Sequence, residues 1–200
     1  TLTFEELCSC AGNIIVIAGG YNSHIFQLAK HQKLSELQKE LDKFCTAFGQ
    51  DFCVEIQKVG KDSEDNFIHT ILPLASSIGI PVIATNDAMF LQQEDFDIHE
   101  TKVCINTGKT LNDPNREKLY TPEQYLKSST DMVNLFDGYG AETLLANTHQ
   151  IAQKCNASFV TDKYFLPEYP VPENHDFNSF LSELSNSKLK DIIHTFGPEQ

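Results

Sequence analysis

The sequence has no long hydrophobic run and no excess of basic residues. Its longest apolar runs are about six residues, whereas a helix needs roughly 20 apolar residues to span a bilayer. Lys and Arg number 15 against 28 Asp and Glu, which gives a formal net charge of -13. Because so acidic a surface repels a phosphate backbone, the composition argues against a free-standing nucleic-acid-binding protein. No membrane-spanning segment is expected either.

The sequence also lacks the cysteine and histidine spacings of metal sites. Its 6 cysteines are scattered without any C-x-x-C pair, which favours reduced thiols in a cytoplasmic protein over a disulfide scaffold. Cys8 and Cys10 form the only close pair, and the next candidate ligand, His24, has no partner near it in sequence. His99 lies in the acidic stretch Glu94–Glu100 at a predicted helix start, where a structural role is favoured over metal binding. We expect this stretch to be a solvent-exposed helix face.

The chain carries no recognisable targeting segment. It starts at Thr1 without an initiator methionine or an apolar signal sequence, and it stops at Gln200 just past an amphipathic pattern. With 40% hydrophobic residues it is able to bury a sizeable core. We therefore expect soluble material that forms part of a longer protein.

Strand and helix patterns alternate along the first half of the chain. Apolar β-branched runs that end near glycine, or alternate with polar residues, predict strands at 13–18, 52–57 and 80–85. Apolar stripes predict helices at 35–48, 66–78, 130–136, 141–155 and 178–194. Alternation of this kind indicates βα units around a parallel sheet, either open or closed into a barrel. The proline-rich passage 167–172 is the best boundary signal.

Functional groups of parallel sheets gather where the strands end. Asp87 follows the predicted strand 80–85 and is the polar residue that stands out at such a position. The alternative is that Asn86 or Asp87 only caps the turn, and the sequence leaves both interpretations open. The T-G-K-T run at 107–110 does not qualify as a phosphate-binding loop, because position 103 is valine where the motif requires glycine.

A series of motifs stands in order along the chain, including I-P-V-I-A-T-N-D at 80–87, D-F-D-I-H-E at 95–100, G-K-T-L-N-D-P at 108–114 and Y-F-L-P-E-Y-P at 164–170. This collinear series resembles the alpha subunit of bacterial DNA polymerase III. The resemblance runs from Phe4 to Phe180 in one register. It implies a polymerase-and-histidinol-phosphatase (PHP) domain at the amino terminus of the subunit, followed by the palm, thumb and fingers.

The expected fold class is therefore α/β. We expect a partial, distorted βα barrel of PHP type, followed by helical segments that lead into the polymerase palm. Residues 1–155 would form the carboxyl-terminal part of the PHP domain, and residues 156–200 would form a linker and the start of the palm. Because the first barrel strands would precede Thr1, the strand at 13–18 should have an open edge.

The resemblance implies template-directed DNA synthesis for the full-length subunit. This reaction depends on Mg²⁺, whose three carboxylate ligands would lie beyond Gln200, while the H-x-H motif that opens the barrel would lie before Thr1. Two-metal chemistry needs those carboxylates to hold two ions about 4 Å apart, and no such triad is visible here. No catalytic residue and no cofactor are expected within this chain.

The metal site of the PHP domain is expected to be degenerate. Asp87 matches a ligand of relatives that keep their metals, but Met89 replaces a histidine two residues later. Gly20 and Val59 stand where relatives carry cysteine and histidine. Because these three side chains cannot bind zinc or manganese, Asp87 is interpreted as a remnant without bound metal. The phosphoesterase activity should be lost.

The resemblance also implies partners. They are the proofreading exonuclease subunit, other replicase subunits and, through the rest of the subunit, primer–template DNA; no membrane is involved. A stand-alone PHP-type phosphoesterase is the alternative, against which Gly20, Val59 and Met89 argue. A pure binding module is a third possibility, and it requires a reading frame that ends near Gln200.

Overall fold

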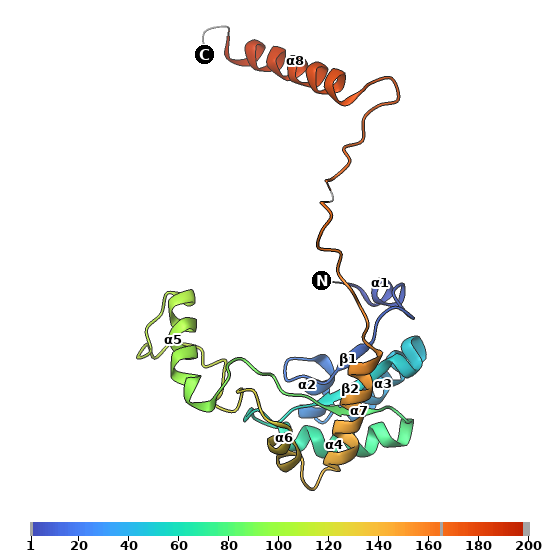
Figure 1. Ribbon diagram of the computed structural model, residues 1–200, viewed down its shortest axis with the longest axis vertical. Coiled ribbons are helices and arrows are strands. Elements are labelled where there is room, and N and C mark those ends of the chain that lie inside the picture. The colour runs from blue at the N-terminus through green and yellow to red at the C-terminus, as the bar shows by residue number, and fades with distance from the viewer. Residues whose placement is uncertain (1, 165, 198–200) are drawn as a thin grey trace. The chain divides into compact units, whose positions relative to one another are not determined.

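The computed structural model describes residues 2–164 and 166–197. By its internal contacts the chain divides into two compact units, Thr1–Asn156 and Ala157–Gln200 (Figure 1). The assignment of residues 1–155 and 156–200 to polymerase domains stays a prediction.

The first unit contains a parallel sheet. Its strands are β1 (Val16–Ala18), β2 (Phe52–Ile56) and β3 (Val82–Ala84), and they lie in the order β1-β2-β3. Both neighbouring pairs are parallel, as the alternating pattern predicted. An α/β fold with a parallel sheet is thus confirmed for this unit, although β1 and β3 are shorter than the predicted strands.

Helices connect the strands of the sheet. The helices of this unit are α1 (Phe4–Cys8), α2 (His24–Lys30), α3 (Leu34–Phe48), α4 (Glu64–Ile78), α5 (Phe96–Thr107), α6 (Ser129–Leu135) and α7 (Ala141–Lys154), with single 3-10 turns η1 (Gly49–Asp51) and η2 (Gln93–Asp95). Of these, α2, α3 and α4 cover one face of the sheet. The helices predicted at 35–48, 66–78, 130–136 and 141–155 are confirmed with small differences at their ends. The short helices α1 and α2 were not predicted, because neither is long enough to show a repeated apolar stripe.

The core lies between the sheet and helices α2, α3 and α4. Val54 of β2 is fully buried, as are Leu41 of α3 and Ile71 of α4. Phe26 of α2 packs its ring 4.8 Å from that of Phe67 of α4. These contacts remove apolar side chains of four elements from water, and this burial is the main force that holds the unit together.

The two edge strands of the sheet differ in the partners of their outer backbone groups. On the outer side of β3, helix α7 donates two side-chain hydrogen bonds to the strand's carbonyls, from Asn147 Nδ2 to Val82 O and from Thr148 Oγ1 to Ala84 O, both 2.9 Å. These bonds satisfy backbone groups that a further strand would otherwise pair. Within the described residues no strand pairs with the outer edge of β1, and Ile17 on that strand is 44% exposed.

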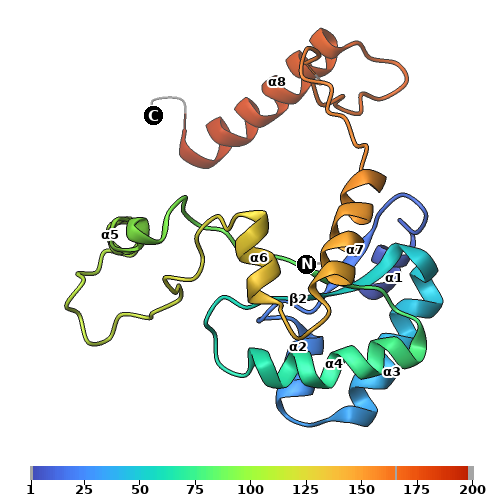
Figure 2. The same ribbon diagram turned by 60° about the horizontal axis from the view of Figure 1, so that its bottom comes forward.

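An arm, defined here as residues 88–127, leaves the sheet after Asp87 and carries α5. It extends away from the strands in both views (Figures 1 and 2). At its base the outgoing and returning segments pair through an isolated bridge between Phe90 and Tyr125, with Leu126 N donating to Phe90 O over 2.9 Å. The arm is therefore joined to the sheet by two adjacent chain segments.

Helix α5 within the arm reverses the usual distribution of polar and apolar residues. Glu100 is only 4% exposed and forms an ion pair with Arg116, whereas Ile98 and Ile105 are 64% and 76% exposed. The prediction that the stretch Glu94–Glu100 lies on the surface is therefore wrong at Glu100. A partner brought near from 16 residues away neutralises this carboxylate, and a buried charge is tolerated when it is paired.

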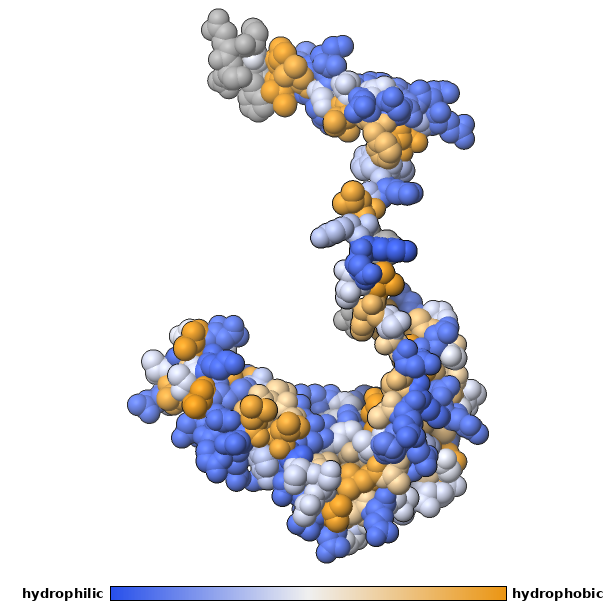
Figure 3. All heavy atoms as spheres, viewed as in Figure 1, coloured by the Kyte–Doolittle hydropathy of each residue, from blue (hydrophilic) through white to orange (hydrophobic). Residues whose placement is uncertain are grey.

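The second unit consists of an extended passage and α8 (Phe177–Phe196), which confirms the predicted final helix. Asp176 begins the helix by accepting a hydrogen bond from Ser179 N at 2.7 Å. The ring of Phe180 lies 6.0 Å from Tyr169 of the proline-rich passage. Apolar side chains remain at the surface of α8, among them Leu181 and Leu189 (Figure 3). None of the helices in the described residues combines the length and the apolar character needed to cross a membrane.

Candidate functional site

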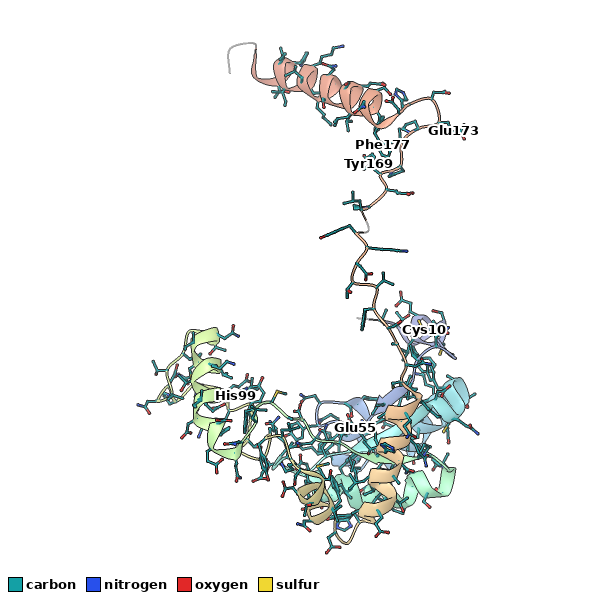
Figure 4. The ribbon with its side chains drawn as sticks, viewed as in Figure 1. Cys10, Glu55, His99, Tyr169, Glu173 and Phe177 are labelled. Atoms are coloured by element: carbon teal, nitrogen blue, oxygen red, sulfur yellow. The ribbon has the colours of Figure 1, made fainter. Side chains whose placement is uncertain are left out.

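Polar side chains meet at the carboxyl ends of β2 and β3. Glu55 lies near the end of β2, Gln57 follows it, and Thr85 follows β3. Thr85 Oγ1 donates to Glu55 Oε2 over 2.7 Å, and Gln57 Nε2 donates to Thr85 Oγ1 over 3.0 Å. Alternate residues of a strand point to the same face, so Glu55 and Gln57 project together from the face opposite the helical layer. Glu55 lies beside the sheet in Figure 4, whereas His99 lies on α5.

Asp87 is the second carboxylate at this end of the sheet. Its Oδ2 accepts a hydrogen bond of 2.7 Å from Nε2 of Gln124. The neighbouring Asn86 donates from Nδ2 to the carbonyl of Tyr125 over 2.7 Å. Neither residue caps its own turn, since both bind the segment that returns from the arm. The capping alternative is therefore wrong, and the strand end instead anchors a distant part of the chain.

Two cavities open at these strand ends, and both are lined by Asp87. A cavity of about 630 Å³ includes Val59 and Met89 in its lining, and one of about 300 Å³ includes Gly20. Tyr21, Asn22 and Gln57 line both. The structure thus brings the four residues singled out by the sequence to one region of the sheet.

The residues of this region do not fit a transition-metal centre. Gly20 offers no side chain, and a Cβ built there would lie 2.9 Å from Glu55 Oε1. Val59 and Met89 present an isopropyl group and a thioether in place of imidazole. One oxygen each of Glu55 and Asp87 already accepts a hydrogen bond from a hydroxyl or an amide. Across the described ranges, no three His, Cys, Asp or Glu side chains are grouped closely enough to hold a metal ion.

A buried carboxylate shapes the turn that carries Val59. Glu64, at the start of α4, accepts hydrogen bonds from Val59 N and Gly60 N, both 3.0 Å long at Oε2. Burial raises the pKa of the Glu64 carboxyl above its ordinary value, because desolvation outweighs these backbone donors. The turn is held from within the protein, so Val59 lies at the cavity with its side chain almost fully buried.

The remaining residues considered from the sequence have local roles. Gly108 ends α5 in a left-handed conformation with φ +67°, and Lys109 Nζ donates to Asn115 O over 3.3 Å, so T-G-K-T at 107–110 forms a helix end. The His99 ring lies 5.3 Å from Phe90 and 4.5 Å from Tyr120. This packing is the structural role that the sequence favoured for His99.

Sequence reasoning missed Glu55, Gln57, Thr85 and Gln124. The first three carried a usable signal, because they are polar residues at or just beyond the end of a predicted strand, the same rule that selected Asp87. Gln124 carried none, since it lies 37 residues from Asp87 in sequence. Only the path of the arm brings the two side chains together.

The thiol of Cys53 should be unreactive in the folded protein. Burial, together with the negative charge of Glu55, raises the pKa of Cys53 to about 11, so at pH 8 about one thiol in a thousand is ionised. Cys10 and Cys155 are exposed and should react with Ellman's reagent first. Peptide mapping of the labelled native protein measures this order, with guanidinium-unfolded protein as the control. Equal labelling of Cys53 and Cys10 before unfolding would contradict the expectation.

Comparison with known proteins gives relatives over most of the chain. The chain is 37% identical over 159 residues to the DNA polymerase III subunit alpha of Pseudomonas aeruginosa, which covers 80% of the chain and 13% of that protein. It is 33% identical over 187 residues to that of Pasteurella multocida (94% and 16%) and 39% identical over 161 residues to that of Escherichia coli (78% and 14%). No protein-family model matches the chain.

The similarity confirms the resemblance stated from the motifs. It covers between 78% and 94% of the chain in these three relatives, and all three bear the same name. The chain spans only 13–16% of their length. What these comparisons give is therefore a match to one segment of the alpha subunit.

Proposed function

We propose that this chain is an internal segment of the alpha subunit of a bacterial replicative DNA polymerase III, the subunit that carries out template-directed DNA synthesis. The observation that carries the proposal is the identity of 33–39% over most of the chain to subunits of that name from three bacteria. In this proposal residues 1–155 form the carboxyl-terminal part of the PHP domain and residues 156–200 form a linker and the start of the palm. The subunit would be cytoplasmic.

The segment itself serves as a non-catalytic scaffold in this proposal. The Mg²⁺ ions of the polymerase reaction would be held by carboxylates outside this chain. Glu55 accepts a hydrogen bond from Thr85 and Asp87 accepts one from Gln124, and Gly20, Val59 and Met89 supply no metal-binding group. This chemistry supports a degenerate PHP site in which Asp87 remains without a metal.

The partial βα barrel is part of the same proposal. Three parallel strands with helices packed on one face are a feature of βα-barrel architecture. The outer edge of β1 has no partner strand among the described residues, and its apolar side chains would suit a neighbouring strand. Strands from a preceding part of the subunit would supply that neighbour.

We further propose that this segment docks the proofreading exonuclease subunit, alongside contacts of the full subunit with other replicase subunits and primer–template DNA. Helix α5 is a candidate surface for a protein partner, because Ile98 and Ile105 lie on the same face of the helix and both are exposed. Glu94 and Asp97, which precede Ile98 in the sequence, are also exposed. Apolar side chains flanked by acidic ones suit a partner surface that combines apolar and basic residues.

The decisive experiment uses the full-length protein encoded at this locus. Sequencing through both ends should find an H-x-H motif upstream and an acidic triad downstream in the same frame. The purified protein should then extend a primed template in the presence of Mg²⁺, and it should not hydrolyse phosphoesters. A frame that closes at these ends would refute the polymerase proposal. Phosphoester hydrolysis that disappears in the Asp87→Ala variant would favour the stand-alone phosphoesterase.

The same preparation tests docking. Purified exonuclease subunit should co-elute with the full-length protein in size-exclusion chromatography, and the Ile98→Glu, Ile105→Glu double variant should bind it about tenfold or more weakly. Val133→Glu serves as the control, because it also replaces an exposed aliphatic side chain by glutamate, but on α6. Unchanged affinity of the α5 variant would exclude this face, whereas no complex with the wild type would exclude docking.

A further inference from the structure

At the base of the arm the buried side chain of Gln124 donates a hydrogen bond to the carboxylate of Asp87. We propose that Asp87 is a positioning residue, whose carboxylate holds Gln124 and thereby fixes the arm, residues 88–127, on the sheet. In this role the acceptor oxygen of Asp87 serves a hydrogen-bond donor of the same chain and not a cation.

Gln124 uses each end of its amide for a different part of the structure. Its Nε2 donates to Asp87 Oδ2 over 2.7 Å, and its Oε1 accepts from Thr121 N over 2.9 Å. Its own backbone carbonyl accepts from Met89 N over 2.8 Å. The residue is only 1% exposed, so an amide without these partners would be buried unsatisfied, which is costly.

These bonds link both strand ends through the returning segment of the arm. Asp87 follows β3, and Thr121, which Gln124 orients, donates from Oγ1 to the carbonyl of Val59 beyond β2. The path from Asp87 through Gln124 and Thr121 to Val59 therefore spans the two strands. Loss of the first bond should loosen the arm at both points of attachment.

A second set of bonds at the same base does not involve Asp87. Asn86 donates to Tyr125 O, and Leu126 N donates to Phe90 O. The core between the sheet and helices α2–α4 lies on the other face of the sheet and shares no member with this network. Removal of the Asp87–Gln124 bond should therefore raise the mobility of the arm while the rest of the unit stays folded.

A positioning role and a metal-ligand role predict opposite outcomes for two substitutions. Asp87→Asn keeps an acceptor oxygen for Gln124 but weakens any cation site, since a carboxylate is the better ligand. Gln124→Glu removes the donor and sets a second carboxylate against Asp87, which breaks the proposed bond through like-charge repulsion but would strengthen a cation site. The pair of variants thus separates the two roles.

The test is hydrogen–deuterium exchange of the full-length protein, read by mass spectrometry over peptides of residues 88–127 and of α4. Asp87→Ala and Gln124→Ala should raise exchange in the arm by about tenfold and leave α4 unchanged. Asp87→Asn should restore most of the protection, and Gln124→Glu should not. Asp97→Ala, an exposed position in the same arm, is the matched control and should behave as the wild type.

Several results would overturn the proposal. If the arm of the Gln124→Ala variant exchanges as slowly as that of the wild type, the bond does not hold the arm. Added Mn²⁺ or Zn²⁺ that protects the arm in the wild type and in Gln124→Glu, but not in Asp87→Asn, would identify Asp87 as a metal ligand. If Asp87→Ala also raises exchange in α4, that variant has lost more of its structure than the arm, and the test is then the comparison of Asp87→Asn with Gln124→Glu. Equal exchange of the arm in those two variants would contradict the positioning role. None of these readouts depends on polymerase activity, so the proposed function is tested separately.

Discussion

Replacing Gly19 with alanine is expected to lower the free energy of unfolding by about 3 kcal/mol or more. Gly19 has φ +135°, a conformation that side chains rarely adopt, and a Cβ built there would lie 2.2 Å from the carbonyl oxygen of Glu55. That oxygen belongs to the backbone of β2, so it cannot move aside as a flexible side chain would. The strand-to-loop junction must shift, and β1 with it. Urea unfolding followed by circular dichroism measures the effect.

Gly79→Ala is the matched control for this prediction. Gly79 also has a positive φ, +81°, but no atom lies within 4 Å of the position that its Cβ would take. Only the conformational cost of a left-handed residue with a side chain remains, about 1–2 kcal/mol. If both variants lose the same stability, the close approach of Gly19 to β2 is not what constrains that position.

The substitution Phe26→Ala is expected to cost about 3–5 kcal/mol. Phe26 is 2% exposed, and its ring lies 4.8 Å from Phe67 and 5.0 Å from Tyr21. Truncation leaves a cavity between α2 and α4 that rigid neighbours fill only in part. Because α2 is short and its stability comes from this packing, the helix should detach before the rest of the unit unfolds. Chemical denaturation gives the loss, and hydrogen exchange of residues 24–30 shows the detachment.

Leu34→Ala provides the comparison. Leu34 begins α3 in the same unit but is 55% exposed, so its truncation should change stability by no more than about 0.5 kcal/mol. A loss at Leu34 as large as that at Phe26 would mean that the packing of α2 is not the source of the effect. Retained protection of residues 24–30 in Phe26→Ala would contradict the proposed detachment.

The candidate site has consequences for the interpretation of single sequences. Asp87 was found because the carboxyl end of a parallel strand is a position where functional groups gather. The same rule applied to β2 would have added Glu55 and Gln57, which alternate with buried apolar residues of that strand. Thr85 donates a hydrogen bond to Glu55 and accepts one from Gln57, whereas Gln124 donates to Asp87. A polar residue at a strand end is therefore a candidate for function, and its donors and acceptors decide what it does.

Local pattern was sufficient for the longer elements of this protein. Helix α3 follows from the spacing of Leu37, Leu41 and Phe48, which are buried on one side of the helix. The strand β2 follows from the alternation of apolar and polar residues before Gly60, and the parallel order follows from the alternation of strands with helices. These features depend on residues close together in the chain, so a single sequence contains the information.

The arrangement of the arm and of the candidate site depends on contacts between residues far apart in the chain. Glu100 has the pattern of a surface residue, and it is buried only because Arg116 comes back to neutralise it. Gln124 reaches Asp87 across 37 residues, and Thr121 reaches the turn after β2 across 62. No periodicity encodes such contacts, since they depend on where the arm returns to the sheet. Asp87, which matches a metal ligand in the sequence, thus accepts a hydrogen bond from the side-chain amide of Gln124 in the folded chain.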